Sequence, residues 1–225
     1  MAIIKKITYK DQVIDYVYQR LVEGRYCPGE QLKESLLARD LGISRAPVRE
    51  ALKELTVRGI VNYRPQAGCF IAQPSPQEIV DAYTARGLLE GYAIMTTRQA
   101  FTSADLRQLS ALVGEMRVAA ERGDRKEVVE VGDVFHTMLV SKQSNSQIAE
   151  YLERLRLKLH VLFCRYWPEL YSPQEIGERH RRIVLSLEAG DAHNIEETVR
   201  THYSESGEKI AALARALGGR ERNVA

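Results

Sequence analysis

Two arginines, Arg45 and Arg49, lie one helical turn apart in a segment whose apolar residues fall on the other side. These apolar residues recur at three- and four-residue steps, which predicts a helix held against a core; they are Val48, Leu52 and Leu55. A guanidinium donates hydrogen bonds to phosphate oxygens and to base edges. A helix with two guanidiniums near its start therefore has the chemistry needed to read a DNA major groove. The plainer alternative is a solvated helix face that binds nothing.

The segment before these arginines predicts a second helix that would position them. Its leucines Leu36, Leu37 and Leu41 are expected to face the core. Gly42 can take the left-handed backbone that ends a helix, and Ser44 is expected to cap the next one. Two helices joined by so short a turn have the layout of a helix-turn-helix.

A hairpin and a further helix complete a winged-helix pattern. The short runs 60–64 and 69–72 have the composition of strands, and residues 65–68 between them have that of a turn. Upstream, residues 9–22 carry apolar residues at helical spacing, namely Val13, Val17 and Leu21. The N-terminal part of the chain is therefore expected to be a winged helix-turn-helix domain with a small β-hairpin wing.

Residues from about 10 to 72 resemble the DNA-binding domain of the GntR family of bacterial transcription regulators. The resemblance is carried by Pro28-Gly29-Glu30-Gln31-Leu32, the run from Leu41 to Leu52, Gly59-Ile60-Val61 and Gly68. It implies that the helix beginning at Ser44 enters the major groove, while the wing tip near Gly68 approaches the minor groove or adjacent phosphates. The implied DNA-contacting residues are Lys33, Ser44, Arg45, Ala46, Pro47, Arg49, Gln66 and Gly68. Ser35 stands where many members present an arginine, and Lys33 can compensate in part.

Size, composition and charge fit a two-domain protein that binds DNA. The chain has 225 residues and a mass of 25.5 kDa, and its 44% hydrophobic and 28% charged residues argue against disorder. Residues 1–72 contain 12 basic and 8 acidic residues, whereas the remainder contains 20 and 22. The excess of basic over acidic residues is concentrated in the domain that would contact DNA phosphates. It is too small for a protein that coats DNA without sequence preference, as histones do.

The sequence also indicates the compartment. No apolar run approaches the length of a membrane span, and no apolar stretch follows the N-terminal lysines, so we expect a cytoplasmic protein with no membrane partner. Cys27, Cys69 and Cys164 are scattered without ligand spacing and are expected to be reduced thiols.

The rest of the chain predicts a helical bundle behind a short linker. Prolines at 74 and 76 end the wing, which gives a winged-helix domain at 1–73, a linker at 74–76 and a helical domain at 77–225. Ser75-Pro76-Gln77-Glu78 has the pattern of a capping box, and the same four residues recur at 172–175. Further helix starts are suggested at Ser103, Asp124, Asn145 and near Asp191. The chain is thus expected to be mainly α, with a C-terminal antiparallel all-α bundle of about six or seven helices.

This second half resembles the FCD ligand-binding domain of the FadR-like branch of the same family. The resemblance is carried by Arg86 with Glu90, Phe135-His136, Asn145, Glu178-Arg179-His180, Ala189-Gly190-Asp191 and His202. In metal-binding members, three histidines and an aspartate from three helices converge in the bundle centre. The matching histidines are His136, His180 and His202, whereas His160 and His193 match no part of the pattern. Gly132 occupies the usual aspartate position, and the carboxylate of Asp133 comes three residues before His136 instead of four.

The residue types agree with a metal and an organic acid as ligands. Neutral imidazole is a good ligand for divalent metals, of which zinc or nickel is expected here, and the alternative is a set of hydrogen-bonded core histidines. Asp133 lies on a similar helix face and could join the site, or water could complete it. The resemblance implies that Arg86 grips the carboxylate of a small organic-acid effector, with Asn145 as a further effector-binding residue. The plainer interpretation of Arg86 is an intrahelical ion pair with Glu90.

Together these features predict a transcription regulator and not an enzyme. We expect a homodimer whose two winged helices read a palindromic operator in double-stranded DNA, with an effector in the bundle that changes operator affinity. Repression is the commoner behaviour in the family. The alternative is a metal-dependent enzyme that uses the three histidines. It lacks a convincing separate general base and would leave the N-terminal module without a purpose.

Overall fold

The computed structural model describes residues 7–222, apart from the side chains of residues 157, 160, 161, 164, 165, 167–169 and 217–222. The chain divides into two compact units between Gln73 and Pro74. Within the described part, none of the helices combines the length and the apolar character that crossing a bilayer requires.

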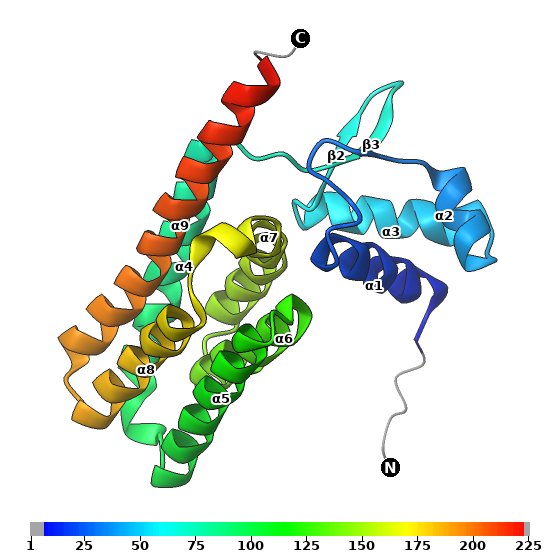
Figure 1. Ribbon diagram of the computed structural model, residues 1–225. Helices are drawn as coiled ribbons and strands as arrows, with labels where there is room; N and C mark the ends of the chain where they lie inside the picture. Colours follow the sequence, from blue (N-terminus) through cyan, green and yellow to red (C-terminus); the bar gives the residue numbers. More distant parts are fainter. Residues whose placement is uncertain (1–6, 223–225) are drawn as a thin grey trace, which may run out of the picture. The chain divides into compact units, whose positions relative to one another are not determined.

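The N-terminal unit has the winged helix-turn-helix order of elements (Figure 1). Its elements are α1 (Tyr9–Val22), β1 (Gln31–Leu32), α2 (Glu34–Leu41), α3 (Arg45–Val57), β2 (Val61–Arg64) and β3 (Gly68–Ile71). The strands form an antiparallel sheet in the order β1-β3-β2, in which Tyr63 pairs with Cys69 and Leu32 pairs with Cys69 from the other side. The predicted winged helix-turn-helix fold is confirmed, and β1 is an addition that the sequence pattern did not indicate.

The core of this unit is made by the predicted stripes of α1 and α3. Val13 and Val17 of α1 and Val48 and Leu55 of α3 are fully buried. On α2 the prediction was wrong in one position, because Leu36 is exposed while its neighbours Leu37 and Ala38 are buried. Gly42 ends α2 in the left-handed conformation with φ 65°, as expected.

The wing turn has an unusual residue at its tip. The backbone N–H of Ala67 donates to the carbonyl of Arg64 at 3.1 Å, and Gln66 has φ 62°. Pro65 at the second position and a positive φ at the third make this a type II turn, where glycine is the usual third residue. Nε2 of Gln31 in β1 donates to the carbonyl of Ala67 at 2.7 Å. The short strand β1 therefore holds the wing tip in place.

The C-terminal unit consists of six α-helices and a short 3-10 turn within the described residues. They are α4 (Pro76–Thr97), η1 (Arg98–Ala100), α5 (Ser103–Glu121), α6 (Arg125–Val140), α7 (Ser146–Leu170), α8 (Pro173–Ala189) and α9 (Ala192–Arg222). Both predicted capping boxes are present, at Ser75 with Glu78 and at Ser172 with Glu175. Ser75 and Pro76 are thus the N-cap and the first residue of α4. The mainly helical fold class is confirmed.

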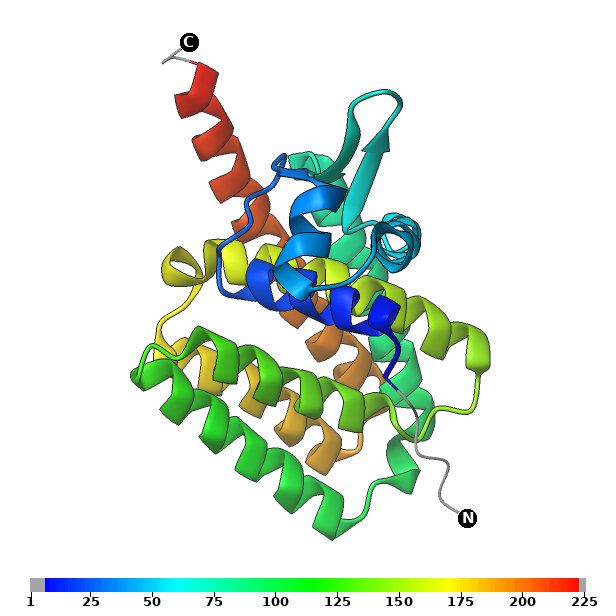
Figure 2. The same ribbon diagram turned by 90° about the vertical axis from the view of Figure 1, so that its right-hand side faces the viewer.

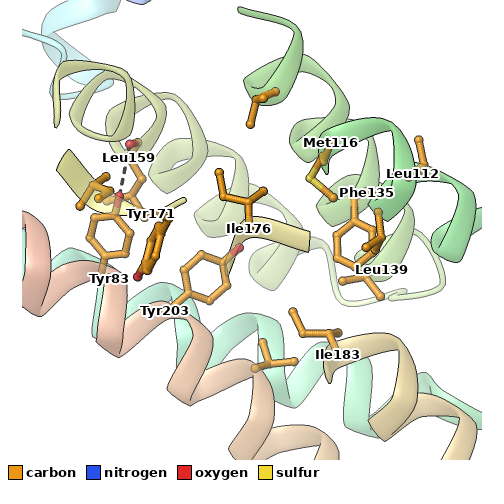
Figure 3. Close-up of a cluster of buried hydrophobic side chains, with 14 of the residues drawn as sticks. Tyr83, Leu112, Met116, Phe135, Leu139, Leu159, Tyr171, Ile176, Ile183 and Tyr203 are labelled. Carbon is orange, nitrogen blue, oxygen red and sulfur yellow. Dashed lines mark hydrogen bonds between the residues drawn. The ribbon is translucent and has the colours of Figure 1, made fainter. Parts of the chain in front are cut away.

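Helices α4 and α9 pack side by side over much of their lengths, and α5 packs against α6 and α8 (Figures 1 and 2). The close α4–α9 approach depends on glycines. A Cβ at Gly87 or Gly91 of α4 would lie 3.1–3.3 Å from backbone atoms of α9, and a Cβ at Gly207 of α9 would lie 2.7 Å from Cβ of Tyr83. Figure 3 shows the core that results, in which the Tyr83 hydroxyl donates to the carbonyl of Leu159 at 3.5 Å.

Candidate functional site

The first candidate site is the exposed face of α3 in the N-terminal unit. Arg45 is exposed and forms no ion pair with any residue that the structure describes. Arg49 is also exposed, and its Nε lies 2.7 Å from Oε2 of Glu34 on α2. An exposed pair of this kind contributes about 0–1 kcal/mol, so a phosphate can compete with Glu34 for the guanidinium. The start of α3 thus presents two cationic side chains that are available to bind phosphates.

The other predicted DNA-contacting residues lie at element ends. Lys33 is the exposed N-cap residue of α2, and Gln66 is exposed at the wing tip. Ser44 occupies the N-cap position of α3, but its side chain makes no capping hydrogen bond, contrary to the expected capping. Ala46 is exposed, while Pro47 and Gly68 are partly buried.

Two wing residues were missed by sequence reasoning. The guanidinium of Arg64 lies 4.5 Å from the ring centroid of Phe70, next to the turn, and so adds a cation at the wing tip. Gln31 supports the same turn through Ala67. A basic residue directly before the Pro-Gln turn was the available sequence signal for Arg64.

The second candidate site lies in the C-terminal unit, where three histidines from three helices meet. His136 of α6, His180 of α8 and His202 of α9 each offer a ring nitrogen, and these nitrogens lie within 4.8 Å of one another. The ring centroids are separated by 4.8–5.5 Å. The sequence predicted all three histidines, and the structure brings them together.

Hydrogen bonds fix the orientation of two of these rings. Nδ1 of His180 lies 2.8 Å from the carbonyl oxygen of Ile176, which can only accept, so Nδ1 carries the proton and Nε2 keeps its lone pair. Nδ1 of His136 lies 2.5 Å from Oε1 of Glu90. Metal-binding histidines are commonly held in this way, by a carbonyl or a carboxylate on the other ring nitrogen.

The electrostatics keep the imidazoles of His180 and His202 in the neutral form that binds metals. Burial, reinforced by His136, lowers the pKa of His180 to about 3. Burial and the neighbouring His180 lower the pKa of His202 well below its ordinary value. Nδ1 of His202 is buried and has no hydrogen-bond partner among the described residues. Imidazoles from three helices, one with an unsatisfied buried nitrogen, fit a divalent metal.

Glu90 links the histidines to Arg86, a connection that sequence reasoning did not foresee. Its side chain is 1% exposed, and Oε2 accepts from the Tyr203 hydroxyl at 2.9 Å and from Nε of Arg86 at 3.2 Å. Burial disfavours the charged form of Glu90, but the charges of His136 and Arg86 outweigh it and hold its pKa at about 2. Glu90 is therefore an anion at neutral pH. The signal in the sequence is the four-residue spacing of Arg86 and Glu90, which predicts a contact between these two residues but not the contact of Glu90 with His136.

Two predicted residues are not part of the group of three histidines. The Asp133 carboxylate pairs with Arg156 of α7, and the group of side chains that could hold a metal comprises the three histidines alone among the described residues. Asn145 is the exposed N-cap of α7, where its Oδ1 accepts from the backbone N–H groups of Gln147 and Ile148 at 3.0 and 3.3 Å. Because Asn145 does not line the cavity described below, we do not retain it as an effector-binding residue.

A cavity of about 90 Å³ adjoins the histidines. Its polar lining includes Arg86, Arg179 and all three histidines, and its apolar lining includes Met116 and Ile176. Arg86 thus faces the same space as the candidate metal ligands, as predicted. Of the remaining histidines, His193 is exposed beside Glu197, and the side chain of His160 lies outside the described residues.

Comparisons with known proteins agree with both units. Residues 9–71 match the bacterial regulatory proteins of the gntR family, and residues 81–205 match the FCD domain. A probable D-xylose utilization operon transcriptional repressor of Paenarthrobacter nicotinovorans is 26% identical over 216 residues, covering 96% of this chain and 93% of the relative. The HTH-type transcriptional repressor RspR of Escherichia coli K12 is 24% identical over 203 residues, covering 90% and 89%.

Solved structures show the same fold. Escherichia coli McbR/YncC superposes with a TM-score of 0.74 at 22% identity, covering 94% of this chain and 99% of that one. A GntR-type regulator of Rhodococcus sp. RHA1 superposes with a TM-score of 0.72 at 20% identity, covering 90% and 97%. The likeness therefore extends over both units.

Proposed function

Because the chain belongs to the GntR family of bacterial transcription regulators and carries an FCD domain, we propose that it is a repressor whose operator affinity is set by a small organic acid. The acid binds in the C-terminal cavity together with a divalent metal, zinc or nickel. The single observation that carries this proposal is that Arg86 and the three histidines line one cavity.

The proposed DNA site is the exposed face of α3 together with the wing tip. Arg45 and Arg49 supply the cations for phosphates and base edges, and Arg64 and Gln66 extend the contact at the wing. A homodimer would present two such faces to a palindromic operator. Two of the relatives are named as repressors, which supports repression over activation.

The proposed effector site uses the three histidines to hold the metal and Arg86 to bind a carboxylate. Nε of Arg86 is engaged by Glu90, and its two terminal nitrogens bond to no described residue. These two nitrogens form the fork that matches both oxygens of a carboxylate. When bound, the metal would supply a Lewis-acidic centre that attracts the acid. The effector changes operator affinity only to the extent that it binds one arrangement of the dimer better than another.

The alternative of a metal-dependent enzyme is set aside. The relatives that match the chain over most of their length are transcription regulators, and so are the solved structures with the same fold.

Three experiments test the proposal. Selection from random duplexes should yield a palindrome that the protein prefers by at least about 10³-fold over unrelated DNA. Metal analysis of protein that has never been exposed to a chelator should give one divalent ion per chain. His180→Ala should remove this ion. The control variant His193→Ala, which changes an exposed histidine, should retain it. A thermal-shift screen of small carboxylic acids with and without metal then identifies the ligand class. No stoichiometric metal in the wild-type protein would defeat the metal part of the proposal.

A further inference from the structure

We propose that the effector is a small dicarboxylate, with one carboxylate on Arg86 and the metal and the other on Arg179. This inference rests on the proposed function and names the chemical class of its ligand. It depends on a second buried guanidinium, on the number of its free N–H groups and on the charge balance of the cavity.

Arg179 is a second buried cation that lines the same cavity. It belongs to α8, one residue before His180, and its side chain is 7% exposed. Its guanidinium lies 4.2 Å from the ring centroid of Tyr171, which packs against one face. In the sequence, Arg179 is notable only as the middle residue of the Glu178-Arg179-His180 motif.

The hydrogen bonds of Arg179 leave part of its guanidinium available. Nη2 donates to the carbonyl of His202 and, at 3.1 Å, to Oγ of Ser206, while Nη1 pairs with Glu205. A guanidinium has five N–H groups, so the one on Nε and one on Nη1 donate to no described residue. An anion in the cavity could accept hydrogen bonds from these N–H groups.

The partner of Arg179 can also be exchanged. The Glu205 side chain is 42% exposed, so solvent competes for its carboxylate. Glu90, the partner of Arg86, is by contrast 1% exposed and holds three donors. The Arg86 pair is therefore fixed, while the Arg179 pair can open toward a ligand.

Charge balance favours a ligand with two negative charges. Among the described residues, each guanidinium at the cavity is balanced by one glutamate, and no carboxylate side chain lines the cavity itself. Asp133, which could have supplied an anionic ligand, pairs with Arg156. A bound divalent metal thus adds two positive charges to a buried space, and a dicarboxylate cancels both.

The test compares acids that have the same number of carbon atoms and differ in charge. Zinc-loaded full-length protein is titrated with malonate, succinate and glutarate, and in parallel with propionate, butyrate and valerate, by calorimetry. We expect at least one dicarboxylate to bind at least tenfold more tightly than its matched monocarboxylate. Equal affinities within every pair would overturn the inference and leave the proposed function standing. If none of the six acids binds, the proposed function fails and the inference fails with it.

Variants locate the second carboxylate. Arg179→Gln should bring the dicarboxylate affinity down to that of the monocarboxylate while leaving the monocarboxylate affinity unchanged. Arg181→Gln, which changes an exposed arginine of the same helix that lines no cavity, is the matched control and should change neither. If Arg179→Gln fails to fold, Arg179→Lys keeps the charge but loses the fork and should give an intermediate dicarboxylate affinity. A folded Arg179 variant with undiminished preference for the dicarboxylate would contradict the assignment.

Discussion

Oε1 of Glu90 on α4 lies 2.5 Å from Nδ1 of His136 on α6, and both side chains are buried. The carboxylate therefore orients the imidazole. Its Nε2 atom is then the nitrogen available for a metal shared with the other two histidines. Through its second oxygen the same glutamate holds Arg86 at 3.2 Å and Tyr203 at 2.9 Å. Burial raises the pKa of Tyr203 well above its ordinary value, so the phenol stays a neutral donor. One buried anion thus positions both a candidate metal ligand and the candidate carboxylate clamp.

Replacing Glu90 with glutamine should weaken zinc binding by about 10–100-fold, because a neutral amide is a poorer acceptor for Nδ1–H than a carboxylate. Gln keeps the size of the side chain, so the helical content should survive. The measurement is competition for zinc against a chromogenic chelator, with far-ultraviolet circular dichroism as the check on folding. Glu188→Gln, at an exposed position of α8, is the control and should bind zinc like the wild type. If the Glu90→Gln protein folds and its zinc affinity is unchanged, the carboxylate has no part in preparing His136 for metal binding.

Arg45→Ala and Arg49→Ala should each weaken binding to the selected operator by about 1–3 kcal/mol where a base contact is lost. The expected loss has a simple cause, since each change removes a guanidinium from the exposed face of α3. Fluorescence anisotropy at a fixed salt concentration provides the comparison. Arg107→Ala, at an exposed position of α5, removes the same charge from the other unit and should leave the affinity intact. Equal losses in all three variants would point to a nonspecific charge effect instead.

Local sequence patterns were enough to predict most of the elements. The apolar stripe of Val48, Leu52 and Leu55 depends only on helical periodicity, and the capping boxes at Ser75 and Ser172 depend only on contacts three residues apart. The three histidines were also found, because the resemblance to a known family carried their positions. These predictions needed no knowledge of how distant segments pack.

The remaining features depend on contacts between segments distant in sequence. Strand β1 has two residues and forms only by pairing with β3, so no local pattern reveals it. The assignment of Asp133 depended on helix periodicity, which does not show that Arg156 of α7 reaches the carboxylate. Likewise the four-residue spacing of Arg86 and Glu90 does not reveal that His136, 46 residues further along the chain, lies beside Glu90. Asn145 shows the opposite case, since its local role as a helix cap already occupies its side-chain oxygen.

Metal-free protein should lose stability between pH 7.5 and 5.5. His180 has a pKa of about 3 when folded and an ordinary value of 6.5, so in this range the unfolded chain takes up a proton that the folded chain does not. The free energy of unfolding therefore falls as the pH falls, by about 1 kcal/mol per such histidine. His202 contributes in the same direction. The lowered pKa of Glu90 also destabilises in acid, but only below its ordinary value of 4.5.

Urea unfolding at the two pH values in the presence of a chelator measures this loss. His180→Gln should reduce the pH dependence, whereas His193→Gln, which changes an exposed histidine, should leave it as in the wild type. A wild-type free energy of unfolding that is independent of pH in this range would mean that the folded histidines titrate normally.

Gly207→Ala and Gly114→Ala should have opposite effects on stability, although both add one methyl group to a helix. A Cβ at Gly207 would lie 2.7 Å from Cβ of Tyr83, an atom that cannot move away without shifting α4, so we expect a loss of about 1–3 kcal/mol. A Cβ at Gly114 in α5 meets no atom within 4 Å, and alanine there should stabilise the helix by about 0.5–1 kcal/mol. Thermal unfolding of the two variants provides the comparison. Because Tyr83 also lines the cavity, Gly207→Ala should weaken carboxylate binding as well. Unchanged stability in Gly207→Ala would mean that α4 and α9 separate easily, which their close packing argues against.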